Sequence, residues 1–170
     1  MERRLLLKNL ALGVATAFVL PDWANAWHPH SFVFESGLTK IEMETLANLV
    51  EAILPTTDTK GAKELEVHQF VALMVKDCYE PKAFVLLKNG LKTIDEHSKT
   101  LTGKLISEAD AKANLQTINS FKTLGTSQIE FINLIKQNAI TGYLNSEYVM
   151  TNLRVYNMVP GKYVGEVNAL

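Results

Sequence analysis

Apolar side chains at helical spacing constrain the fold of this chain more than any other feature. Leu46, Leu49 and Val50 recur three to four residues apart until Pro55 interrupts the pattern. A stripe with this period indicates an amphipathic helix. The spacing returns in several later segments, whereas the alternating pattern of a half-buried strand is scarce. The sequence therefore predicts an all-α fold, a single bundle of five or six helices with an irregular arm at each end.

Cap motifs predict where these helices begin. Thr39 and Ser127 are each followed three residues later by a glutamate, the pattern of a capping box. Ser107 with Asp110, and also Ser146, are expected to cap two shorter helices. The expected helices are 39–54, 62–79, 81–102, a short one after Ser107, one from 127 to about 143, and a last one from 146 to about 153.

The chain has one cysteine, Cys78, which excludes an intrachain disulfide. It continues the spacing of Val71 and Met74 on the apolar side of its predicted helix. Free cysteine behaves as a small buried hydrophobe. We therefore expect a buried thiol rather than one that bridges to a partner chain.

The N-terminal segment has the layout of an export signal. Arg3 and Arg4 precede a short apolar run that ends at Pro21, and an A-x-A site follows. Adjacent arginines in this position are typical of the twin-arginine address, whose residues here are Arg3, Arg4, Leu6, Leu7, Lys8, Ala24 and Ala26. We expect cleavage after residue 26 and a periplasmic location, with residues 27–170 as one domain. The alternative is an uncleaved anchor or a short buried helix.

The expected mature chain gives no indication of nucleic acid or membrane binding. Removing residues 1–26 from the 170 leaves 144, with 14 basic and 16 acidic residues and a formal charge of −2. A nucleic-acid-binding domain would carry a basic footprint. The run before Pro21 is shorter than the 20 or so apolar residues that cross a bilayer, so no stable transmembrane segment is expected after cleavage.

The sequence offers no recognisable cofactor site. It lacks G-x-G-x-x-G after a strand and C-x-x-C-H, and one cysteine cannot hold an iron–sulfur cluster. We therefore expect no catalytic residue and no cofactor in this chain. His28 and His30 leave one alternative, a small periplasmic metal-binding protein that uses both imidazoles, although no helix face carries two ligands at metal-binding spacing.

The tail 154–170 is rich in valine, tyrosine, proline and glycine and has no helical period. Its apolar content is too high for a typical disordered segment. Two interpretations stand side by side: the tail wraps the bundle, or it lies on another protein, where aromatic side chains often dominate binding.

Four stretches together resemble one family, the gluconate 2-dehydrogenase subunit 3 family. Residues 142–147 (GYLNSE) are similar to its G-Y-x-x-S-E pattern, and 153–165 (LRVYNMVPGKYVG) to its L-x-Y-x-P-V-P-G-x-Y-x-G tail. Residues 53–62 (ILPTTDTKGA) resemble its I-x-P-x-T-D-T-P-G-A loop, and 67–71 the helix after it. The sequence departs from these patterns at three points. Lys60 and Met158 stand where proline is usual, and one extra residue separates Leu153 from Tyr156.

The resemblance implies a non-catalytic small subunit. In that family a large subunit of the glucose–methanol–choline type holds FAD and oxidises a sugar or sugar acid, and a cytochrome c subunit, where present, takes the electrons onward. The small subunit carries the signal to the twin-arginine translocase and escorts the large one. A stand-alone periplasmic helical module is the remaining alternative.

On this view the two arms and the loop at 55–61 form much of the interface with the flavoprotein. The residues expected there are Trp27, Phe32, Phe34, Pro55, Thr57, Asp58, Tyr143, Ser146, Glu147, Tyr148, Tyr156, Pro160, Gly161 and Tyr163.

Overall fold

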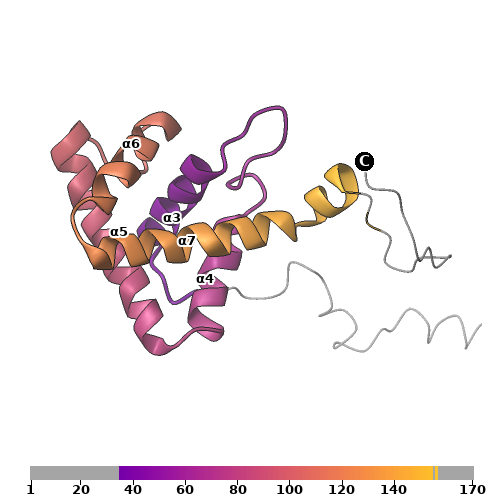
Figure 1. Cartoon of the computed structure of the whole chain (residues 1–170), viewed down its shortest axis with the longest axis horizontal. Coiled ribbons are helices and arrows are strands. Elements are labelled where there is room, and N and C mark those ends of the chain that lie inside the picture. Colours follow the sequence, from indigo (N-terminus) through magenta and orange to yellow (C-terminus); the bar gives the residue numbers. More distant parts are fainter. Residues whose placement is uncertain (1–34, 155, 157–170) are drawn as a thin grey trace, which may run out of the picture. The chain divides into compact units, whose positions relative to one another are not determined.

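The computed structural model describes residues 35–154 and 156, and this part of the chain is helical with no strand (Figure 1). The described helices fall within one unit of the chain that starts at Ser36. An all-α bundle is therefore confirmed, whereas the export signal and most of both arms lie outside the described residues. The helices are α3 (Lys40–Ile53), α4 (Val67–Asp77), α5 (Pro81–Thr102), α6 (Ala111–Lys122), α7 (Thr126–Leu144) and the π-helical segment η1 (Val149–Leu153).

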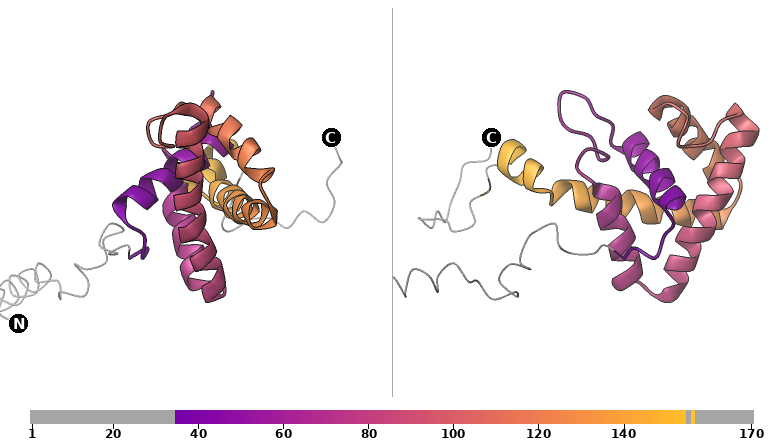
Figure 2. Two further views of the ribbon diagram at one scale, coloured as in Figure 1. Left: turned by 90° about the vertical axis from the view of Figure 1, so that its left-hand side faces the viewer. Right: turned by 180° about the vertical axis from the view of Figure 1, so that it is seen from behind.

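Helix α7 organises the bundle. It runs across α5, α3 and α4 in turn and ends beside the loop that follows α3 (Figures 1 and 2). Both α3 and α7 contact each of the other four α-helices. Their apolar stripes meet in a core whose largest fully buried side chains are Leu46, Leu49, Val50, Val71, Leu87, Leu91, Ile94, Ile106, Phe121, Phe131, Ile132 and Ile135.

Gly90 allows α5 and α7 to approach closely. It is buried, and a Cβ added there would overlap the ring of Phe131 on α7. That ring in turn packs edge-on against Phe121 of α6, with the ring centroids 6.0 Å apart. Glycine is a poor helix former, but at position 90 it leaves room for the Phe131 ring. Helices α5, α6 and α7 can therefore pack around the Phe121 and Phe131 rings.

The predicted capping box of α3 is confirmed, and two other predicted caps are wrong. The Thr39 hydroxyl accepts from the Glu42 N–H at 3.3 Å, and a Glu42 carboxylate oxygen accepts from the Thr39 N–H at 2.8 Å. Helix α7 instead starts one residue before Ser127, after an extended Gly125. Ser107 lies in a turn before α6, and Asp110 occupies the N-cap position of that helix but makes no side-chain cap bond. The S/T-x-x-E pattern does not show whether its serine or threonine is the cap or already lies in the first turn. Ser127 fits the pattern with Glu130, yet it lies inside α7.

Helix α4 is shorter than predicted, and the expected burial of Cys78 is wrong. Residues 62–66 form turns because Glu66 adopts a left-handed conformation (φ 52°), which a right-handed helix cannot include. The helix then ends at Asp77, so Cys78 lies past the stripe that Val71 and Val75 bury, and its thiol is exposed. An exposed thiol is accessible to a partner chain.

Within the described ranges, none of the helices is long and apolar enough to cross a membrane.

Gly90→Ala tests the close approach of α5 and α7. Alanine favours helix by up to about 1 kcal/mol over glycine, but overpacking a core costs about 1–3 kcal/mol. We expect a net loss of stability in urea or thermal unfolding. Asn89→Ala, an exposed change on the same helix, should stay within about 0.5 kcal/mol of the wild type. A Gly90→Ala chain as stable as the wild type would contradict this packing role.

Candidate partner-binding site

The loop between α3 and α4 is exposed, yet its base is held by one carboxylate. Glu51, in the last turn of α3, accepts from both the backbone N–H and the hydroxyl of Thr56 through Oε1, each at 2.8 Å. Its Oε2 accepts from the Lys63 N–H at 2.9 Å. Below these bonds the Ala62 N–H donates to the Leu54 carbonyl at 3.0 Å. The two ends of the loop are therefore joined through Glu51.

Gly61 leaves the space in which this carboxylate fits. A Cβ at this position would overlap the Thr56 hydroxyl and lie 2.6 Å from the Glu51 Oε1 atom. Any side chain at residue 61 would therefore push apart two groups that are hydrogen-bonded to each other.

The electrostatics of Glu51 favour its ionised form. Partial burial acts to raise the pKa of the carboxyl group. The hydrogen bonds from Lys63 and Thr56, with the charge of Lys63, outweigh burial and hold that pKa below its ordinary value of 4.5. At neutral pH the carboxylate is therefore fully charged and all three hydrogen bonds can form.

The far side of the loop is fixed to the end of α7. The Tyr143 hydroxyl donates to the Lys60 carbonyl at 3.0 Å and lies 3.4 Å from the Thr59 hydroxyl. The Lys60 ammonium group pairs with Glu64 at 2.8 Å and lies 5.6 Å from the centre of the Tyr148 ring. Residues more than 80 positions apart in the sequence are thus brought to one end of the bundle.

The C-terminal helical turn supplies the second half of this surface. Helical residues begin at 147 and lead into η1, and Ser146 caps them as predicted, because its hydroxyl accepts from the Val149 N–H at 3.4 Å and donates to the Tyr143 carbonyl at 2.7 Å. An open hollow of about 380 Å³ lies beside it. Its lining consists of Leu65, Ser146, Glu147, Tyr148, Thr151 and Asn152.

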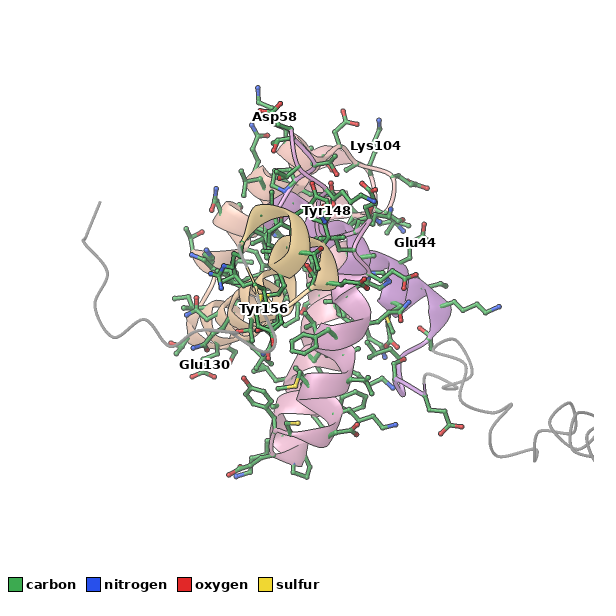
Figure 3. All side chains as sticks on the ribbon, turned by 90° about the vertical axis from the view of Figure 1, so that its right-hand side faces the viewer. Glu44, Asp58, Lys104, Glu130, Tyr148 and Tyr156 are labelled. Atoms are coloured by element: carbon green, nitrogen blue, oxygen red, sulfur yellow. The ribbon has the colours of Figure 1, made fainter. Side chains whose placement is uncertain are left out.

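The structure brings together most of the predicted interface residues that it describes. Figure 3 labels Asp58 on the loop and Tyr148 on the helical turn, and the two segments meet where the Lys60 ammonium group lies near the Tyr148 ring. The side chains of Pro55, Thr57, Asp58 and Glu147 are exposed, and those of Tyr143, Ser146 and Tyr148 are partly covered. We name this surface, formed by residues 55–61 and 143–152, the loop–turn surface.

Tyr156 lies just after the last helical turn, with an exposed side chain. The other predicted interface residues, Trp27, Phe32, Phe34, Pro160, Gly161 and Tyr163, lie outside the described residues, as do His28, His30 and the signal residues Arg3, Arg4, Leu6, Leu7, Lys8, Ala24 and Ala26.

Sequence reasoning missed the residues that hold the loop, namely Glu51, Lys60 and Gly61. Glu51 did carry a signal. A carboxylate in the last turn of a helix opposes the helix dipole, and no basic residue in the last turn of α3 offsets it. A carboxylate in this position is expected to find hydrogen-bond donors elsewhere, but the sequence could not show that the Thr56 and Lys63 N–H groups would supply them.

The rest of the described bundle contains a partly buried histidine and a second hollow. Over residues 35–154 and 156, no three His, Cys, Asp or Glu side chains are placed to hold a metal. Burial lowers the pKa of the His68 imidazole, an effect that Glu66 opposes and Lys63 reinforces, so His68 is neutral at pH 7. A hollow of about 400 Å³ between α5 and α7 reaches Gly90 and Phe131, and Lys82 is its one charged lining residue.

The sequence matches a model of a known family. The family described as gluconate 2-dehydrogenase subunit 3 matches residues 40–161, a range that starts at the first residue of α3 and includes every described helix. No curated protein and no solved structure matches the chain.

Glu51→Gln tests the charge at the base of the loop. Because the folded pKa lies below the unfolded value, the carboxylate stabilises the fold above pH 4.5, and this contribution is lost as the pH falls through the folded pKa. We expect the wild type to exceed Glu51→Gln in unfolding free energy by a constant amount above about pH 5, with the gap closing below pH 4.5. Urea unfolding at several pH values measures the gap; a gap that widens on acidification would contradict the assignment.

Proposed function

Since the chain belongs to the gluconate 2-dehydrogenase subunit 3 family, we propose that it is the non-catalytic small subunit of an FAD-dependent sugar or gluconate dehydrogenase. It binds the large flavoprotein subunit, of the glucose–methanol–choline type. FAD belongs to that partner, and a cytochrome c subunit, where the complex has one, receives the electrons.

One observation carries the binding role: an exposed loop is hydrogen-bonded to the bundle at both of its sides. Exposed loops are ordinarily mobile, and ordering them on association weakens binding. Here Glu51 and Tyr143 already fix the loop. The loop–turn surface is therefore suited to recognition by a partner, and exposed Asp58 and Glu147 give it a polar rim.

The proposed interface extends beyond the loop–turn surface. A lasting contact between subunits buries roughly 2,000 Å² or more in total, which is more than one loop and one helical turn provide. We propose that the arms 27–37 and 148–170 contribute the remainder, the second arm through its residues after 152. Their tryptophan, phenylalanine and tyrosine side chains are of the types enriched at interfaces.

The proposed role also includes export. The arginine pair at positions 3 and 4 is the address of a translocase that carries folded proteins. A chain without a recognisable cofactor site has no evident need of that route for itself. We propose that it escorts the folded, FAD-loaded subunit to the periplasm.

Co-purification with a matched charge variant tests the binding role. The tagged wild-type chain should capture an FAD-containing subunit from its own cells, measured by flavin absorbance. Asp58→Lys should reduce the affinity about tenfold, because it reverses a charge on the loop–turn surface. Glu130→Lys makes the same change on an exposed residue of the first turns of α7 and should leave the affinity unchanged. Capture of no flavoprotein would favour the stand-alone module instead.

Replacing Arg3 and Arg4 with lysine tests the escort role. The flavoprotein subunit should then remain in the cytoplasmic fraction, because the complex has lost its address. Cell fractionation followed by flavin measurement gives the distribution. A flavoprotein that still reaches the periplasm would rule out export by this chain.

A further inference from the structure

The loop–turn surface depends on a residue that does not itself lie at the tip of the loop. Pro55, Thr57 and Asp58 are exposed, while Glu51 is only partly exposed and directs both carboxylate oxygens to the loop backbone and to Thr56. We infer that Glu51 is a positioning residue for partner binding, which acts through the loop and not by touching the partner. This inference rests on the proposed function.

Every side-chain hydrogen bond that Glu51 accepts comes from the loop or its ends. Its two oxygens accept three hydrogen bonds, all from Thr56 and Lys63, which stand on the two sides of the loop. Hydrogen bonds to a charged acceptor are stronger than those between neutral groups. Glu51 therefore joins the sides of a short loop with the kind of contact that best resists opening.

The place of Glu51 in α3 argues against a role in the helix itself. A carboxylate in the last turn is unfavourable to the helix dipole. The absence of a side chain at Gly61 also leaves room for the Glu51 carboxylate and the Thr56 hydroxyl. The carboxylate of Glu51 and the glycine at position 61 thus serve the same contact at the base of the loop.

The tip of the loop, residues 57–59, has a second anchor in addition to Glu51. Tyr143 and the Lys60 contacts with Glu64 and Tyr148 hold the far side. Between the anchors, the Thr57 N–H donates to the Thr59 carbonyl at 3.1 Å and turns the tip. If Glu51 is lost, the tip keeps one anchor, and association with the partner must then order the rest of the loop.

Glu51→Gln tests this inference in the full-length chain with the captured flavoprotein subunit. Glutamine keeps the size of the side chain but replaces one acceptor oxygen with a donor group. We expect affinity for the flavoprotein to fall about tenfold. Glu44→Gln, an exposed change on the same helix, should stay within about twofold of the wild type.

A double variant separates positioning from a general loss of stability. If Glu51 acts through the tip, Glu51→Gln should add less than about twofold to the loss caused by Asp58→Lys, since coupled residues are non-additive. Additive losses would overturn the inference. Hydrogen exchange on the free chain gives a second readout: the amides of Thr56 and Lys63 should be slow in the wild type and fast in Glu51→Gln, with α5 and α7 unchanged.

The outcomes distinguish this inference from the proposed function. Capture of the flavoprotein with equal affinity by the wild type and Glu51→Gln overturns the positioning role alone. Capture of no flavoprotein by the wild type overturns the proposed function and the positioning role with it. Equally fast exchange at Thr56 in both chains also overturns the positioning role, because the loop would then not be held by Glu51.

Discussion

The packing of the Phe131 ring against Gly90 is the contact on which the arrangement of the helices depends. It sets how closely α7 approaches α5, and through Phe121 it places α6 as well. Protein interiors are packed as densely as organic crystals, so a helix fixed in this way has little freedom to slide or rotate. The direction of α7 follows from this contact together with a second close contact, that of Gly142 with Phe70 near its other end.

The candidate site takes its geometry from that helix. Phe131 and Tyr143 are twelve residues apart on α7, which corresponds to about 18 Å along a helix axis. Near the far end, Gly142 packs so closely on Phe70 that an added Cβ would lie 2.6 Å from the ring. Tyr143 is thereby directed to the loop after α3. A core contact and a surface contact are thus linked by one rigid element, and the loop is positioned by both.

The proposed division of labour has a physical basis. A chain of this size can bury a sufficient core without a metal or a disulfide, and most of the side chains that the described helices bury are apolar. Its polar side chains are consequently available for local tasks, such as the contact of Glu51 with Thr56 and Lys63. Under the proposed function, the task of these side chains is to shape a loop that a partner recognises.

Prediction from the sequence succeeded where a structure depends on neighbours along the chain. The box formed by Thr39 and Glu42, the Ser146 cap and the helical stripe of α3 need only residues three or four positions apart. Prediction failed where the backbone made an unexpected local choice. The left-handed Glu66 delays α4, and the early end of the same helix exposes Cys78. Positive φ is expected mainly of glycine, asparagine and aspartate, so nothing in the sequence indicates it for Glu66.

By itself the sequence determined the all-α class, most of the helices, the family and the motifs that compose the candidate site, because these depend on periodicity and local chemistry. Only the tertiary structure decided how that site is assembled. Tyr143 meets Lys60 across more than 80 residues, and Gly61 admits the Glu51 carboxylate. Such contacts depend on the distance and direction of packed helices, which the spacing of residues along a chain does not specify.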